Sequence, residues 1–186
     1  AHRAYYTRKV QHPTEAVLEQ PKTGRATQIA NLLALPALAA TVIYIVKPAW
    51  LSWSALPLPL RLRWLGVAVA LAGFGLLQWS QQSLGRNWSD APVLLEDQEL
   101  VTSGPYRWIR NPIYSAFLLI LGSPLLISAN WLVGGLWIAM TSLDIASRIR
   151  MEEAMMLEQF GRQYRAYMGR TGRLVPRLVR RAKGAN

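Results

Sequence analysis

The sequence predicts an all-α protein, a polytopic bundle of transmembrane helices. Hydrophobic residues make up 52% of its 186 residues and charged residues only 17%, and the charges are unevenly spread. Residues 26–46 form an uncharged stretch of 21 residues, and residues 64–85 form another of 22. A helix needs about 20 apolar residues to cross the hydrocarbon core of a bilayer. Each stretch is therefore long enough for one span.

A third uncharged stretch, residues 111–143, is 33 residues long, which is long for one span and short for two. Ser128, Ala129 and Asn130 interrupt it with poor helix formers, and a tryptophan of the kind found at membrane interfaces comes next. We therefore expect a tight helical hairpin over roughly 113–128 and 131–150. With the first two stretches, the chain would then have four spans.

The segment between the first two spans has the composition of an interfacial connector. Residues 48–60 carry no charge and contain Trp50, Trp53, Pro57 and Pro59. Tryptophan is enriched where membrane and water meet, and proline ends helices. We expect this segment to lie at the membrane surface rather than to form a fifth span.

The basic residues predict the orientation of the chain. The net charge is +11, and most of the basic residues lie in the leader 1–25, the loop 86–110 and the C-terminal tail from Arg148. In a four-span chain these three segments share one side, which the positive-inside rule places in the cytoplasm, with both termini. The first 25 residues lack the apolar region of a signal peptide. The sequence thus favours an inner or plasma membrane protein with a cytoplasm-facing site.

Several kinds of partner and chemistry are disfavoured by the composition. There is no cysteine, and the only histidines, His2 and His12, lie in the polar leader. We therefore expect no metal site and no catalysis by a thiol or an imidazole. The positive charge lies at the ends of apolar segments without a nucleic-acid-binding motif, which indicates lipid headgroups rather than nucleic acid as its partner.

Three charged residues come after the predicted hairpin at helical spacing. Asp144, Arg148 and Glu152 stand at i, i+4 and i+8, so they share one face of a helix that leaves the membrane. A carboxylate near lipid is costly unless it has a partner or a wet cavity, and Arg148 can be that partner. Two interpretations stay open at this point, a structural ladder of ion pairs and a polar site at the cytoplasmic membrane surface.

A second informative stretch, residues 100–114, precedes the hairpin. Gly104 and Pro105 favour a turn, and Asn111 with Pro112 is typical of a helix cap and a first-turn proline. Taken alone, the stretch is better explained as an ordinary interfacial loop with aromatic residues. Its combination with the motifs on the far side of the hairpin is more specific.

Three motifs in this order resemble those of the membrane isoprenylcysteine carboxyl methyltransferases. They are Gly-x-Tyr-x-x-x-Arg-Asn-Pro-x-Tyr from Gly104, Arg-x-x-x-Glu-Glu from Arg148, and Phe-Gly-x-x-Tyr-x-x-Tyr from Phe160. Phospholipid methyltransferases share the Arg-His/Asn-Pro and Glu-Glu elements more distantly. The resemblance covers about residues 84–176, including Leu-Val-Thr-Ser-Gly before the first motif and Tyr-Met-Gly-Arg-Thr-Gly-Arg after the last.

Length and hydropathy predict one membrane domain, 1–186, with a polar leader (1–25) and two spans (26–83), and the resemblance makes residues 84–186 a methyltransferase-like half. Small relatives usually have a further helix before the first span, and residues 1–25 are too polar to supply it. The expected fold is a bundle with a helical hairpin and cytoplasmic C-terminal helices, with four spans in this chain and five if such a helix precedes it.

The resemblance also implies S-adenosylmethionine as methyl donor, bound between the hairpin loop and the C-terminal helices without a glycine-rich Gly-x-Gly-x-x-Gly motif. Many relatives have Arg-His-Pro where this chain has Asn111, so a histidine acid–base role is not available. Backbone groups at 99–101 could read the adenine edge. The implied donor contacts are Gln98, Glu99, Leu100, Val101, Tyr106, Asn111, Pro112, Ile113, Tyr114 and Glu152.

The implied reaction is methyl transfer to a lipophilic acceptor from the membrane, a carboxylate as in isoprenylcysteine O-methylation. Arg148 would bind that carboxylate beside Asp144, and a carboxylate needs no base at neutral pH. With an amine or thiol acceptor, Glu153 or Asp144 would be the candidate base. The alternatives are a phospholipid-amine N-methyltransferase, a small-thiol S-methyltransferase and, in a different class, a non-enzymatic membrane scaffold with a structural ion-pair ladder.

Overall fold

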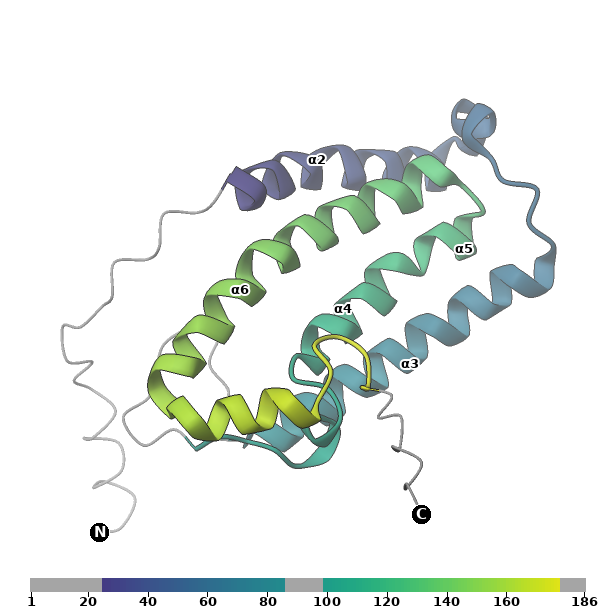
Figure 1. Ribbon diagram of the computed structural model, residues 1–186. Helices are drawn as coiled ribbons and strands as arrows, with labels where there is room; N and C mark the ends of the chain where they lie inside the picture. The colour runs from purple at the N-terminus through teal and green to yellow at the C-terminus, as the bar shows by residue number, and fades with distance from the viewer. Residues whose placement is uncertain (1–24, 86–98, 178–186) are drawn as a thin grey trace, which may run out of the picture.

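The computed structural model describes residues 25–85 and 99–177, and the all-α prediction is confirmed there. Figure 1 shows the long helices side by side in a single layer. Contacts join α2 to α6, α6 to α4 and α5, and these two to α3, so α2 and α3 are the outer helices. The elements are α2 (Arg25–Val46), η1 (Pro48–Ser54), α3 (Leu60–Leu84), η3 (Gly104–Arg107), α4 (Pro112–Gly122), α5 (Pro124–Ser128) and α6 (Trp131–Arg170).

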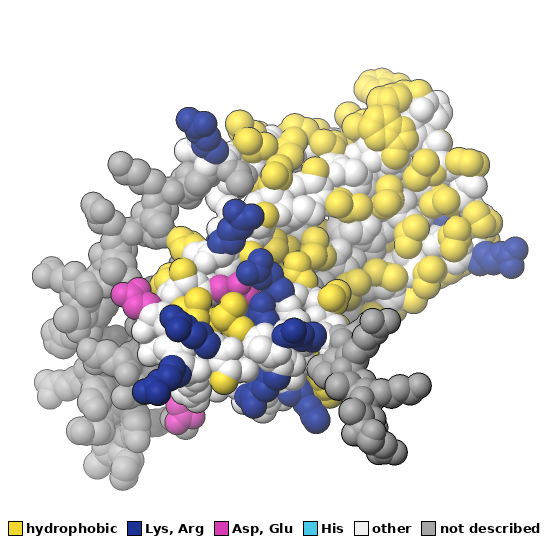
Figure 2. Space-filling view, viewed as in Figure 1, with side chains coloured by type: hydrophobic (Ala, Val, Ile, Leu, Met, Phe, Trp, Pro, Cys, Tyr) yellow, Lys and Arg dark blue, Asp and Glu magenta, His cyan; other side chains and the backbone are white. Residues whose placement is uncertain are grey.

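The surfaces of these helices are apolar enough for a lipid environment. In the described part of the chain, α2, α3 and α6 are each long and apolar enough to cross a membrane, and the pair α4–α5 forms a shorter apolar segment. Leu32 and Leu35 on α2 are 73% and 75% exposed, as lipid-facing side chains are. Figure 2 shows apolar side chains over the upper and right-hand parts, with Lys and Arg gathered below. The prediction of a multi-span membrane protein is confirmed.

Small residues allow α3 to approach its neighbours closely. Gly66, Gly73 and Ser80 recur every seven residues and are the buried residues of α3. A Cβ atom on Gly73 would lie 2.8 Å from Ile120 Cγ1 of α4, and one on Gly66 would lie 2.8 Å from Leu126 Cβ of α5. In membranes, where lipid tails are as apolar as side chains, close packing of this kind is what holds helices together.

The third span differs from the prediction, which expected one helix over 113–128. The segment is divided into α4 and α5 between Ser123 and Pro124. Pro124 has no N–H to donate to the carbonyl one turn earlier, so the helical ladder is interrupted there. The hydroxyl of Ser123 donates instead to the carbonyl of Ile120 at 2.7 Å. This bond satisfies a backbone acceptor that would be costly to leave unpaired at membrane depth.

The fourth helix is longer than the predicted 131–150. α6 continues to Arg170 and has 40 residues, which is about twice the length that a bilayer core requires. Its start matches the prediction, because the side chain of Asn130 accepts hydrogen bonds from Leu132 N and Val133 N. Gly161 interrupts it at φ 48°, a conformation that glycine adopts readily, and the helix changes direction there (Figure 1).

The connector between the first two spans agrees with the prediction. Pro48–Ser54 forms a 3-10 helix in which Trp50 and Trp53 are exposed. The ring of Trp53 meets the edge of Trp131 at 5.5 Å between centroids. α3 begins at Leu60, directly after Pro59 and four residues earlier than the uncharged stretch, and Arg63 in its first turn donates to the carbonyl of Ile127 (Nε to O, 2.9 Å). These tryptophans mark one end of the bundle.

Candidate active site

The predicted site residues meet at the other end of the bundle, where α6 faces the start of α4. The closest contact is between Tyr114 of α4 and Glu152 of α6, whose hydroxyl and carboxylate oxygens are 2.5 Å apart. Residues 38 positions apart in the sequence are thus joined by a short hydrogen bond to a charged acceptor. The structure thus brings together two of the donor contacts that the resemblance implied, one from each helix.

One turn towards the membrane from Glu152, the predicted ion pair is present. Arg148 Nε lies 2.9 Å from Asp144 Oδ1, and the two side chains are 46% and 33% exposed. This bond uses one of the nitrogens of the guanidinium group. Over residues 25–85 and 99–177, Nη1 and Nη2 of Arg148 have no further hydrogen bond. Arg148 therefore has a partner that orients it and still has donors for an anion.

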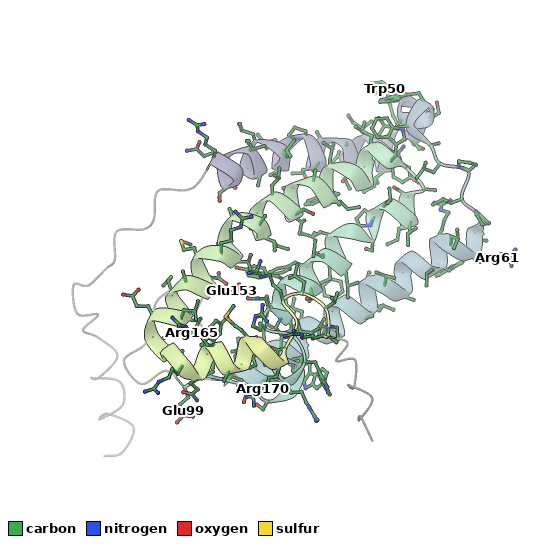
Figure 3. All side chains as sticks on the ribbon, in the orientation of Figure 1. Trp50, Arg61, Glu99, Glu153, Arg165 and Arg170 are labelled. Carbon is green, nitrogen blue, oxygen red and sulfur yellow. The ribbon has the colours of Figure 1, made fainter. Side chains whose placement is uncertain are left out.

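Glu153, next to Glu152, has entirely different surroundings. It is 4% exposed, and its carboxylate receives Arg110 Nε at 3.1 Å and Arg173 Nη2 at 2.5 Å. Arg110 also donates to the carbonyls of Met168 and Thr171. Figure 3 shows Glu153 on the side of α6 that faces the centre of the molecule. We call Glu153, Arg110 and Arg173 the Glu153 cluster.

The Glu153 cluster lies beside a short backbone pairing between distant segments. Residues 171–177, the C-terminal loop, run alongside the loop before α4, with a parallel bridge between Ile109 and Gly172. Arg110 N donates to the carbonyl of Gly172 at 2.8 Å, and Asn111 N donates to that of Arg173 at 3.1 Å. The end of α6 is thereby fixed against the start of α4.

Tyr106 of η3 contacts the C-terminal part of α6 near the Glu153 cluster. It is buried, and its carbonyl accepts a hydrogen bond of 2.6 Å from the hydroxyl of Tyr167, near the end of α6. Burial raises the pKa of Tyr106 above its ordinary value, and the nearby Tyr167 and Glu152 add to the rise. The Tyr106 phenol is therefore neutral at physiological pH and can donate a hydrogen bond. The predicted turn is also present, since Gly104 has φ 56°.

Asn111 and Pro112 begin α4, as predicted, but the side chain of Asn111 does not cap the helix. Its amide nitrogen points instead to the Glu153 cluster, 3.4 Å from the carbonyl of Arg173 and 3.5 Å from Glu153 Oε1. The capping prediction was therefore wrong for the side chain, which is oriented by these long-range contacts of its nitrogen. The backbone carbonyl of Asn111 accepts from Ser115 N in the ordinary helical way.

The remaining predicted donor contacts are less closely associated with these groups. Leu100, Val101 and Ile113 are not among the polar contacts of the site, and Leu100 and Val101 are half-buried. Glu99 is exposed, and Figure 3 shows it at the lower edge of the molecule, apart from Glu153. Gln98 lies outside the described residues. The structure thus brings Tyr106, Asn111, Tyr114 and Glu152 together but not the side chain of Glu99.

The sequence reasoning missed Arg110, Arg173 and Tyr167 as site residues, although all three belong to the segments that carry the family resemblance. Their role depends on partners 20 to 61 residues away. No local pattern in the sequence signals these long-range partners.

The side chains around Glu152 have the chemistry that S-adenosylmethionine requires. Its ammonium and adenine N–H groups need acceptors, and its sulfonium is favoured near carboxylates and aromatic faces. Gln159 stands seven residues after Glu152, so it shares the same face of α6. Its Oε1 atom is buried and accepts no hydrogen bond from the part of the chain that the structure describes. The unpaired oxygen of Gln159, on the same face of α6 as Glu152, is an acceptor that such a ligand could use.

Comparison with known proteins agrees with the resemblance. Residues 64–158, just over half of the chain, match the model of the isoprenylcysteine carboxyl methyltransferase (ICMT) family. The fold is similar to a solved structure of the eukaryotic intramembrane Ras methyltransferase ICMT. The TM-score is 0.62 at 24% identity, over 78% of this chain and 51% of that one.

Two curated relatives match in sequence. One is the uncharacterized protein YpbQ of Bacillus subtilis, 32% identical over 97 residues, which are 51% of this chain and 57% of the relative. The other is the protein-S-isoprenylcysteine O-methyltransferase of Tribolium castaneum, 30% identical over 128 residues, which are 62% of this chain and 43% of the relative. The chain spans about half the length of the curated relatives it matches.

Proposed function

Because the chain belongs to the isoprenylcysteine carboxyl methyltransferase family, we propose that it is a membrane methyltransferase that methylates a lipophilic carboxylate from S-adenosylmethionine. One observation carries the proposal. Glu152, which accepts a hydrogen bond from Tyr114 of α4, and the ion pair Asp144–Arg148 stand one turn apart on the same face of α6. The first pair suits a cationic donor and the second an anionic acceptor.

On the donor side, the proposed role of the chain is to bind and orient. S-adenosylmethionine supplies a methyl group activated by a sulfonium. The carboxylate of Glu152 would accept from the ammonium or the ribose hydroxyls, and Tyr114 holds that carboxylate at 2.5 Å. The neutral phenol of Tyr106 offers a further donor, and the Gln159 amide oxygen a further acceptor. Burial of these groups excludes water, which strengthens each contact.

On the acceptor side, Arg148 is proposed to bind the carboxylate through its two terminal nitrogens. Asp144 holds Arg148 through Nε, which limits the rotation of the guanidinium group. A new bond would join a carboxylate oxygen to the methyl carbon while the bond from carbon to sulfur breaks, with its electron pair remaining on sulfur. The carboxylate is already ionised at neutral pH, so no general base is needed, and positioning supplies most of the rate.

Glu153 is proposed as a positioning residue rather than a base. Two arginines occupy its carboxylate, and it is almost fully buried. Both of its oxygens face arginines, so neither is directed at a reacting group. If the acceptor were an amine or thiol, Asp144 would be the better candidate base, since it is one-third exposed on the acceptor side.

The lipophilic nature of the acceptor is inferred from the location of the site. The polar pairs lie on α6 just beyond its apolar first half, which is the level at which a membrane lipid or a prenyl group presents its polar end. The positive-inside rule supports a site that faces the cytoplasm. Such a site would take its acceptor from the inner leaflet and its donor from the water phase.

The test is methyl transfer by the purified protein in detergent, with a radiolabelled donor and three acceptors offered in parallel. They are a prenylated cysteine with a free carboxylate, phosphatidylethanolamine and a small thiol. We expect label on the prenylated cysteine, in a base-labile ester. Label on the amine or the thiol alone would support one of the alternative methyltransferases, and binding of the donor without transfer to any of the three would contradict the proposal.

The proposal also predicts the effect of changing Arg148. Arg148→Ala should reduce transfer to the carboxylate acceptor by about a hundredfold or more, because a fixed charge that aligns the acceptor is lost. Donor affinity should stay close to that of the wild type. Arg165→Ala, an exposed arginine on the same helix beyond Gly161, is the matched control and should keep full activity. An equal loss of donor affinity in Arg148→Ala would assign Arg148 to the donor site instead.

A further inference from the structure

A groove is present on a different face of α6 from the candidate active site. It has a volume of about 240 Å³ and lies between α4, α6 and the C-terminal loop. Its walls are mainly apolar, and two arginines stand among them. The residues that line it include Leu118, Ile145, Ala146, Ile149, Arg150 and Arg173.

Helix geometry separates this groove from the proposed methyl-transfer site. Successive residues of an α-helix are about 100° apart, so Arg150 lies about 160° around α6 from both Arg148 and Glu152. Ile145, seven residues before Glu152, lies only about 20° from it, so the apolar part of the groove borders the face that carries Glu152. An anion beside Arg150 would nevertheless lie on the opposite side of α6 from Arg148.

The arginines of the groove lie at a defined depth. Arg150 comes 19 residues after Trp131 on α6, which corresponds to about 28 Å along the axis. Trp131 is 48% exposed and packs against Trp53, as expected at a membrane interface. The hydrocarbon core is about 30 Å thick. Arg150, and Arg173 beside it, are thus at the headgroup level of the opposite leaflet, with the apolar wall of the groove on its lipid side.

The charge balance at this level is positive. Arg173 is half-exposed and binds Glu153, but Glu153 also neutralises Arg110, so two arginines share one carboxylate. Arg150 is exposed and has no ion pair over residues 25–85 and 99–177. Figure 2 shows Lys and Arg side chains gathered over this lower part of the molecule. An anion in the groove would meet two guanidinium groups and an apolar wall together.

We propose that this groove binds an anionic phospholipid of the surrounding bilayer. The phosphate would lie between Arg150 and Arg173, and one acyl chain would run along Leu118, Ile145 and Ile149. Basic pockets between helices at the cytoplasmic surface recognise anionic headgroups in this way. Because Arg173 also binds Glu153, the lipid would stabilise the C-terminal loop against α6. The proposal does not depend on the methyltransferase activity.

The test is a titration of the delipidated full-length chain with phosphatidylglycerol or phosphatidylcholine in detergent, monitored by native mass spectrometry and by thermal unfolding. We expect phosphatidylglycerol to bind more tightly than phosphatidylcholine. Only phosphatidylglycerol should raise the Tm of the protein. Arg150→Ala should weaken phosphatidylglycerol binding about fivefold, since each basic group at the surface contributes about that factor. Arg162→Ala, exposed on α6 and outside the groove, should leave binding unchanged.

A second variant tests the apolar wall. Ala146 is exposed, so Ala146→Trp can fill the groove without disturbing the packed core, and it should abolish phosphatidylglycerol binding while Tm without lipid stays the same. Equal binding of both lipids, or equal losses in the Arg150 and Arg162 variants, would overturn the proposal. So would unchanged lipid binding in Ala146→Trp accompanied by loss of methyl transfer, which would make the groove the path of the acceptor.

Discussion

At the residue scale, the neighbours Glu152 and Glu153 have different partners because consecutive residues of a helix point about 100° apart. Glu152 meets Tyr114, and Glu153 meets Arg110 and Arg173. The spacing of Asp144 and Arg148 was enough to predict their ion pair, since both lie on one helix. The partners of Glu153 could not be predicted in this way, because they are brought to it by the chain from 43 and 20 residues away.

This difference predicts the effect of Glu153→Gln. The change removes a buried charge that two arginines share, and Arg110 is left largely buried without compensation. Loss of one partner from a buried ion pair costs about 3 kcal/mol, so Tm in detergent should fall by several degrees. Glu158→Gln, an exposed glutamate further along the same helix, is the matched control and should unfold like the wild type. Equal Tm values for the two variants would contradict the role of the Glu153 cluster.

At the scale of the elements, the apolar stretches predicted the spans well, and the polar interruptions predicted the hairpin turn. The sequence pattern did not separate α4 from α5, although Pro124 begins α5, because hydropathy does not register a missing N–H. It also ended α6 too early. That helix continues beyond the apolar stretch because Tyr164 and Tyr167 are buried and Tyr167 bonds to η3, contacts that depend on distant residues.

Packing between α3 and α4 gives a test at this scale. A leucine at Gly73 would place its Cβ 2.8 Å from Ile120 Cγ1, so the helices must move apart. Overpacking of this kind costs about 1–3 kcal/mol, and Gly73→Leu should lower Tm accordingly. Gly75 is two residues away, and a Cβ there would have nothing within 4 Å. The Tm of Gly75→Leu should therefore equal that of the wild type or be slightly higher. Similar Tm losses in both variants would show that helix contact is not the cause.

At the scale of the whole molecule, the helices form one layer, with Trp50, Trp53 and Trp131 at one end and most of the described charged side chains at the other. The orientation of this layer in the membrane rests on the distribution of basic residues. Composition could predict the fold class and the two ends of the bundle. It could not predict which helices are neighbours, because all of the spans present similar apolar surfaces, and small residues such as Gly66 and Gly73 decide which of them approach closely.

The orientation can be tested directly because the chain contains no cysteine. Single cysteines at Ser52, exposed in η1, and at Gln163, exposed near the end of α6, mark the two ends of the bundle. In intact cells a membrane-impermeant maleimide should label Ser52→Cys and should label Gln163→Cys only after the cells are opened. The reverse pattern would place the candidate active site outside the cell.

Whether Tyr114 and Glu152 hold a methyl donor beside Arg148 can be measured as donor binding. Calorimetry in detergent with S-adenosylhomocysteine, the stable product, should detect a single site on each chain. Tyr114→Phe removes a hydrogen bond to a charged group, so the affinity should fall about tenfold or more. Arg148→Ala should bind as the wild type does. The absence of any binding heat from folded wild-type protein, or normal binding by Tyr114→Phe, would contradict the account.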